Sequence, residues 1–191
     1  MPISIPSDTL SAAGRAAHDL GLAALLGGNL FARVAMHPAL ADVSDPRQRG
    51  RVVNHAWRRY GTVNAAGLAA VVAGWGAARA GEARGPLLSD PERALARVKD
   101  ALVVTVAVTG LAAAVEGVRF GQSAPDGAVP LADGDDPLPE TPARAARLKR
   151  VLRTVGAANL AAEAALVGVN AALSQAGFRR PPARRWLKRR F

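Results

Sequence analysis

Residues Val155–Leu173 read Val-Gly-Ala-Ala-Asn159-Leu-Ala-Ala-Glu163-Ala-Ala-Leu-Val-Gly-Val-Asn170-Ala-Ala-Leu. The stretch is almost entirely apolar, yet it carries an acid close to its centre. A helix that crosses the roughly 30 Å hydrocarbon core of a bilayer needs about 20 mostly apolar residues. The stretch therefore predicts a membrane-spanning helix that holds an ionisable group inside the membrane.

Three further stretches have the same character: Leu20–Met36, Val63–Ala78 and Ala101–Val118. Half of the chain is apolar but only 4% is aromatic, so Ala, Val, Leu and Gly fill these stretches. Small residues allow helix backbones to approach closely in lipid. The sequence predicts an all-α fold, a four-helix transmembrane bundle that forms one domain over residues 1–178.

Signals for helix starts lie well before the apolar stretches. Ser44-Asp45-Pro46 and Thr141-Pro142 place a capping residue before a proline, and Ser89-Asp90-Pro91-Glu92 has the pattern of a capping box. We therefore expect the second, third and fourth helices to extend beyond the bilayer by several turns.

The segment between the third and fourth helices, Gly121–Glu140, is rich in proline and aspartate. Such a composition is typical of a solvated, mobile loop. Its Asp133-Gly-Asp-Asp136 cluster lacks the spacing of a calcium-binding loop, so we predict an acidic loop without a metal.

The net charge is +10, and much of it lies in a basic C-terminal tail, residues 179–191. Basic residues next to a membrane attract anionic lipids, so we predict lipid partners here rather than nucleic acid. The candidate headgroup-binding residues in the tail are Arg184, Arg185, Lys188, Arg189 and Arg190.

The chain has no cysteine, which excludes disulfides, thiolate metal sites and cysteine nucleophiles.

The number of spans and the charge of the tail together predict a topology. An even number of spans places both termini on one side, and the positive-inside rule makes that side the cytoplasm by a narrow margin. The strong bias towards Arg, Ala and Gly is typical of a GC-rich bacterial genome. We therefore expect a multi-pass protein of the bacterial plasma membrane.

Polar residues within the predicted spans share helix faces. Polar side chains in a membrane usually face the bundle interior and pair with one another, so we predict a polar seam with Arg33 as the counter-ion of Glu116 or Glu163. Glu163 is nearest the middle of its span and is the strongest functional candidate. The residues of the predicted seam are Asn29, Arg33, Glu116, Asn159, Glu163 and Asn170.

The seam has two interpretations. It is either a ligand pocket or proton-handling site, or a set of interhelical hydrogen bonds that fixes the packing of the helices. A cavity the size of a small molecule would favour the first interpretation, and a closed seam would favour the second.

The sequence contains no motif that identifies catalytic residues. The three histidines lack the Glu-x-x-His pattern of a di-iron bundle, and no nucleotide loop or dinucleotide fingerprint is present. We therefore expect no metal and no cofactor, and we favour a non-enzymatic membrane protein whose oligomeric state, monomer or homo-oligomer, stays open.

Several short motifs resemble those of known proteins. Ala17-His18-Asp19-Leu20-Gly21-Leu22-Ala23, Gly27-Gly28-Asn29-Leu30-Phe31 and Asp45-Pro46-Arg47 resemble an uncharacterised group of actinobacterial four-span membrane proteins, as do Trp57-Arg58-Arg59 and Val63-Asn64. The resemblance covers most of residues 15–120 and implies the four-span fold. That group has no assigned activity that could be carried over.

More distantly, Met36-His37-Pro38-Ala39 followed by Trp57-Arg58-Arg59-Tyr60 is similar to the anthrone-oxygenase-like membrane family. This resemblance implies four spans and a cofactor-free oxygenase that acts on a small molecule. Three functions thus remain open: a membrane protein without enzymatic activity, an oxygenase-like enzyme that binds a small apolar molecule, and a small proton-coupled transporter that uses Glu163.

Overall fold

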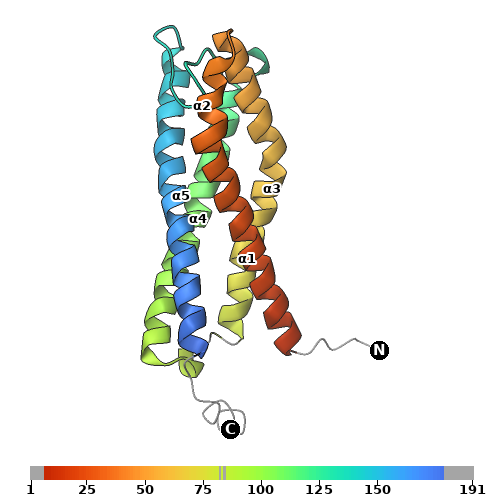
Figure 1. The fold of residues 1–191 in the computed structure, drawn as a ribbon, viewed down its shortest axis with the longest axis vertical. Helices are drawn as coiled ribbons and strands as arrows, with labels where there is room; N and C mark the ends of the chain where they lie inside the picture. The colour runs from red at the N-terminus through yellow and green to blue at the C-terminus, as the bar shows by residue number, and fades with distance from the viewer. Residues whose placement is uncertain (1–6, 82, 84, 179–191) are drawn as a thin grey trace, which may run out of the picture.

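The protein is a bundle of four long helical segments that run alternately up and down (Figure 1). The computed structural model describes residues 7–81, 83 and 85–178. The described part is all-α and has no strand, which confirms the predicted fold class. The elements in chain order are α1 (Ser7–Phe31), η1 (Ala32–Met36), α2 (His37–Ala39), η2 (Leu40–Asp42), α3 (Pro46–Ala80), η3 (Gly85–Leu87), α4 (Asp90–Gly121), η4 (Pro125–Gly127) and α5 (Ala143–Phe178).

The first long segment changes its helical geometry near its end. Between α1 and α2, η1 is a π-helical segment in which the N–H of His37 bonds to the carbonyl of Ala32, five residues earlier. Pro38 follows directly and has no N–H to donate, so the regular α-helical ladder is interrupted here. Such π segments often occur at functional sites, and this one turns the His37 side chain into the bundle, where it is buried.

A helix begins at each of the three predicted starts, and the predicted capping interaction forms at two of them. Asp45 accepts a hydrogen bond from the N–H of Arg47 at 2.9 Å, and Ser89 and Glu92 form a capping box at the start of α4. Thr141 differs from its prediction: its hydroxyl donates to the carbonyl of Pro130 at 2.6 Å, because the preceding loop folds back over it.

The four helices form two tight pairs, α1 with α3 and α4 with α5, and the contact between the pairs is looser. Glycines bring α1 and α3 close together. A Cβ on Gly21 would lie 2.6 Å from the carbonyl oxygen of Gly67, and one on Gly74 would lie 2.4 Å from that of Gly14. Any side chain at Gly21 or Gly74 would therefore push the two backbones apart.

Two apolar clusters hold the pairs together, one at each end of the bundle. The first, near the turn that contains η3, includes Val71, Trp75, Val103 and Leu166. The second lies at the end that holds α2 and η4, and its fully buried members are Val53, Phe120, Val129, Leu131 and Ala145.

The outer surface of the bundle is strongly apolar. Val104, Val108, Leu111, Val115 and Val118 form one stripe along α4, and each is at least half exposed. Four segments, Ala12–Asp42, Pro46–Ala80, Asp90–Gly121 and Ala143–Ala176, are long and apolar enough to cross a membrane. An exposed apolar face of this length fits contact with lipid. These features are those of a multi-pass membrane protein.

The loop between α4 and α5 is packed against the bundle, which differs from the solvated segment that its composition predicts. Val129 and Leu131 are fully buried, and a Cβ on Gly50 would lie 2.0 Å from the Val129 carbonyl oxygen. Arg49 of α3 donates to the carbonyls of Leu131 and Ala132. The loop folds inward because its few apolar residues fill the open end of the bundle, and Figure 1 shows it lying over that end.

Candidate functional site

Glu163 lies at the centre of the bundle and is completely buried. The side-chain amide of Asn29, from α1, donates to both of its carboxylate oxygens at 2.9 and 3.1 Å. The amide of Asn159, one turn earlier on α5, donates to Oε1 at 2.6 Å. The two contacts from Asn29 link the two helix pairs through a single acid, and the contact from Asn159 lies within α5.

Thr109 fixes the orientation of the second amide. Its hydroxyl lies 2.6 Å from the Oδ1 atom of Asn159, to which it donates. With Oδ1 engaged by α4, the NH₂ group of Asn159 faces Glu163. The carboxylate is therefore held by amide donors from two helices, and a third helix fixes one of those donors.

A cavity of about 660 Å³ extends from Glu163 towards the loop-covered end of the bundle. Leu25 and Val106, which belong to the first apolar cluster, close the cavity near Glu163. Its walls come mainly from α3, α4 and α5 and are largely apolar. The principal wall residues are Val53, Trp57, Gly61, Asn64, Ala65, Leu68, Gly110, Leu111, Ala113, Ala114, Gly117, Val118, Phe120, Leu152 and Gly156.

The cavity exists because glycine and alanine occupy positions where larger residues would fill it. A Cβ on Gly61, Gly117 or Gly156 would meet no atom within 4 Å. These three glycines lie on α3, α4 and α5, and all three line the cavity. The open space is thus encoded by residues from three helices.

A second polar cluster lies at the end of the cavity nearest the loop. His37 Nδ1 is 3.0 Å from a carboxylate oxygen of Asp135, and its Nε2 accepts a hydrogen bond from the Trp57 indole at 3.1 Å. Lys149 of α5 is buried, with its ammonium 3.8 Å from Asp135 and 5.3 Å from the centre of the Phe120 ring. Residues of α2, α3, α5 and the loop therefore meet at this cluster.

Asp135 is the loop residue around which this cluster is built. Burial raises the pKa of its carboxyl, but the hydrogen bond with His37 and the positive charges of Lys149 and Arg33 outweigh burial. The net effect holds the pKa of Asp135 below its ordinary value. The carboxylate is therefore ionised and fastens the loop to α2 and α5.

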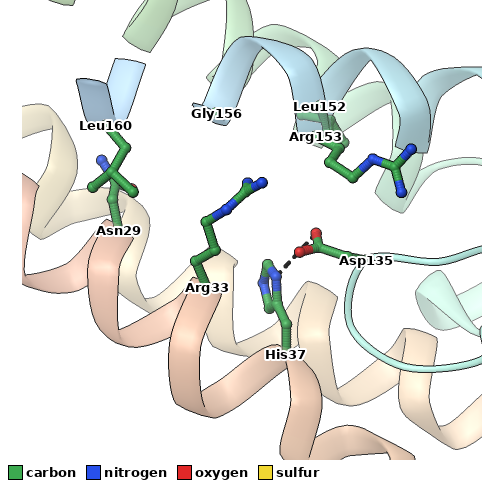
Figure 2. A pocket seen from close by; sticks show the side chains of 8 residues that line it. All are labelled: Asn29, Arg33, His37, Asp135, Leu152, Arg153, Gly156 and Leu160. Carbon is green, nitrogen blue, oxygen red and sulfur yellow. Dashed lines mark ion pairs between the residues drawn. The ribbon is translucent and has the colours of Figure 1, made fainter. Parts of the chain in front are cut away.

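A small pocket of about 60 Å³ lies on the other side of the same residues (Figure 2). Asn29, His37 and Asp135 line both this pocket and the large cavity. In Figure 2, Arg33 and Arg153 border the small pocket, and Arg33 extends from the α1–η1 segment towards α5. Asn29, His37 and Asp135 therefore lie between the small pocket and the large cavity.

The structure divides the predicted seam into separate groups. Asn29, Asn159 and Glu163 lie together on one network. Arg33 is not the counter-ion of Glu163, which is a correction: it is exposed and lies near Asp135, because it occupies the π segment about one turn beyond Asn29. The Asn29 amide takes the place next to Glu163 that we predicted for Arg33.

Glu116 and Asn170 are also removed from the network around Glu163. Glu116 pairs with Arg119, one turn later on the outer part of α4, so it is not a partner of Arg33. Asn170 donates to Asp19 at 2.8 Å and accepts from Lys99. It belongs to a polar group nearer the η3 end, where Lys99 also lies 4.2 Å from the centre of the Trp75 ring.

The tail residues predicted to bind lipid headgroups lie outside the described residues, so that prediction stays open. Within residues 7–81, 83 and 85–178, no group of three or more His, Asp or Glu side chains is arranged to hold a metal ion.

Sequence reasoning missed the cluster around Asp135 as a site. In the sequence, His37 and Trp57 belong to short motifs and Asp135 belongs to an acidic segment, and no local pattern joins them. The proline after His37 was the available signal, because it indicates an interrupted helix at that point.

Comparison of the chain with protein-family models, with curated proteins and with solved structures finds no match.

Proposed function

We propose that this is an integral membrane protein that binds a small, mainly apolar molecule in the cavity between its helix pairs. The cavity volume of about 660 Å³ carries the proposal. Sites for small molecules typically measure about 300–1,000 Å³ and combine apolar walls with a few convergent polar groups. A seam that served only to fix helix packing would be closed.

The edge of the cavity supports entry from the bilayer. Gly61 of α3 and Leu111, Ala114 and Val118 of α4 line the cavity and are also exposed. The space between these two helices thus borders the surface that lipid would cover. In this proposal the protein sits in the bacterial plasma membrane with both termini in the cytoplasm, and its ligand partitions into the membrane before it binds.

The test uses the neutral probe 2-(naphthalen-1-yl)ethanol and the full chain in lipid nanodiscs. Wild type should bind the probe saturably, above the level measured in empty nanodiscs. Gly117→Leu should weaken binding at least about tenfold, because its side chain enters open space in the cavity. Gly168→Leu is the matched control: this glycine also meets no atom within 4 Å but does not line the cavity.

Two results would contradict the proposal. One is the absence of saturable binding by wild type. The other is equal binding by Gly117→Leu and wild type, which would place the probe elsewhere on the protein or in the lipid.

A second candidate is a cofactor-free oxygenase that acts on the bound molecule. The observation in its favour is that His37 and Trp57, one from each motif, both line the cavity and share a hydrogen bond. Membranes with the wild-type protein should then convert anthrone and dioxygen to anthraquinone and water faster than membranes with Trp57→Leu. Equal rates would remove this candidate.

A further inference from the structure

Glu163 has hydrogen bonds but no counter-ion. In the described part of the chain, its polar contacts are the amides of Asn29 and Asn159, and it forms no ion pair with Lys, Arg or His. Amide NH₂ groups are donors only. Both amides therefore donate to the carboxyl oxygens, an arrangement that suits a carboxylate.

The cations of the bundle interior are engaged elsewhere. Lys149 lies beside Asp135, and Lys99 contacts Asn170 and the face of Trp75. Arg33 is exposed and lies near Asp135. A buried carboxylate without a cation is costly, because neutral donors recover only part of its lost hydration. A cation that reached Glu163 would therefore meet an acid that none of these side chains pairs with.

The cavity reaches as far as Glu163, whose carboxyl group is fully buried beneath the amides of Asn29 and Asn159. Glu163 lines the cavity at its closed end, and Val106, Leu68 and Gly110 form apolar surface next to it. Asn64 also lines the cavity, and its buried Oδ1 has no hydrogen-bond partner. A donor group that enters the cavity thus finds a carboxylate and a free amide oxygen within apolar walls.

We infer that the cavity takes a lipophilic cation, an apolar molecule with a protonated amine that pairs with Glu163. This inference rests on the proposed function, since it assigns the ligand class of the same cavity. The apolar body lies between α3, α4 and α5, and the ammonium group displaces an amide and donates to Glu163.

The test compares two probes that differ only in their polar group: 2-(naphthalen-1-yl)ethylamine, protonated at neutral pH, and 2-(naphthalen-1-yl)ethanol. Binding to the protein in nanodiscs is measured after subtraction of the signal from empty nanodiscs. Wild type should bind the amine at least about tenfold more tightly than the alcohol, since hydrogen bonds between charged groups are the stronger ones.

Glu163→Gln should abolish the preference for the amine and still bind the alcohol, because the amide keeps the size of the side chain. Glu116→Gln is the matched control: it also removes an acid from the bundle, but Glu116 pairs with Arg119 and does not line the cavity. The preference should survive in this variant.

The outcomes separate the two proposals. Equal binding of both probes by wild type would overturn the lipophilic-cation inference and leave the binding cavity in place, and this result needs no variant. A preference that survives Glu163→Gln would also overturn it. Failure of both probes to bind saturably, or binding that is unaffected by Gly117→Leu, would overturn the proposed function itself.

Discussion

At the scale of single residues, two acids have opposite surroundings. Glu163 is held by neutral amides and faces an apolar cavity, whereas Asp135 lies among His37, Lys149 and Arg33. A carboxylate among cations stabilises the fold wherever it is ionised. Asp135 therefore holds the loop to the bundle through its ion pair with Lys149, whereas Glu163 has only amide partners among the described residues.

The charge of Asp135 should make the stability of the protein depend on pH. Because the pKa of this carboxyl is lower in the folded than in the unfolded state, its contribution is complete above the ordinary carboxyl value and is lost as the pH falls through the folded value. The thermal midpoint of wild type in detergent should therefore decline as the pH is lowered below the ordinary carboxyl value.

Asp135→Asn should reduce the fall of the thermal midpoint that accompanies a fall in pH. At neutral pH it should also lower the free energy of unfolding by about 3 kcal/mol, because Lys149 stays buried without its partner. Asp126→Asn serves as the control, since Asp126 is an exposed acid of the same loop. If Asp126→Asn and Asp135→Asn flattened the profile equally, the assignment to Asp135 would be wrong.

At the scale of the elements, glycine has two distinct uses. On the face shared by α1 and α3 it allows the two backbones to touch, and on the cavity walls it leaves space empty. In the first case a side chain would meet backbone atoms, which have little freedom to move. In the second case it would meet nothing, so substitution should change binding before it changes stability.

Gly21→Ala should therefore destabilise the protein by about 1–3 kcal/mol, as overpacking does, because its Cβ would lie 2.6 Å from the Gly67 carbonyl oxygen. Gly27→Ala on the same helix should be neutral or stabilising by up to about 1 kcal/mol, since its Cβ meets nothing within 4 Å and alanine favours helix. Unfolding in mixed micelles measures both values, and equal effects would refute the close contact between α1 and α3.

At the scale of the whole molecule, the arrangement of the bundle predicts its topology. α1 begins and α5 ends at the same end, and the loop that follows α4 covers the opposite end (Figure 1). If the bundle spans the membrane, these two ends face opposite compartments. The chain has no native cysteine, so single introduced cysteines can report on each side.

Ala13→Cys and Glu140→Cys place thiols at exposed positions near the two ends. In sealed cells, an impermeant maleimide should label Glu140→Cys from outside, whereas Ala13→Cys should react only after the cells are opened. Membrane integration has its own check: washing the membranes with carbonate should leave the protein in the pellet. Labelling of both sites in intact cells would contradict the four-span topology, and labelling of Ala13→Cys alone would reverse the orientation.

The sequence by itself determined the class of the fold and several of its boundaries. Long apolar runs predicted the four helices, since only helices satisfy the backbone within such a run in lipid. Local capping signals such as Ser89 with Glu92 placed helix starts correctly, because capping depends on residues only a few positions apart. The central position of Glu163 in its span also indicated the acid at the middle of the bundle.

Only the tertiary structure decided which polar residues meet and how much space lies between the helices. Helical periodicity places Arg33 and Asn29 on one face, but the π segment changes that face and directs Arg33 towards Asp135. The inward packing of the acidic loop depends on residues far apart in the sequence, such as Gly50 and Val129. The cavity arises where glycines from three helices coincide, and no local pattern in one helix encodes that coincidence.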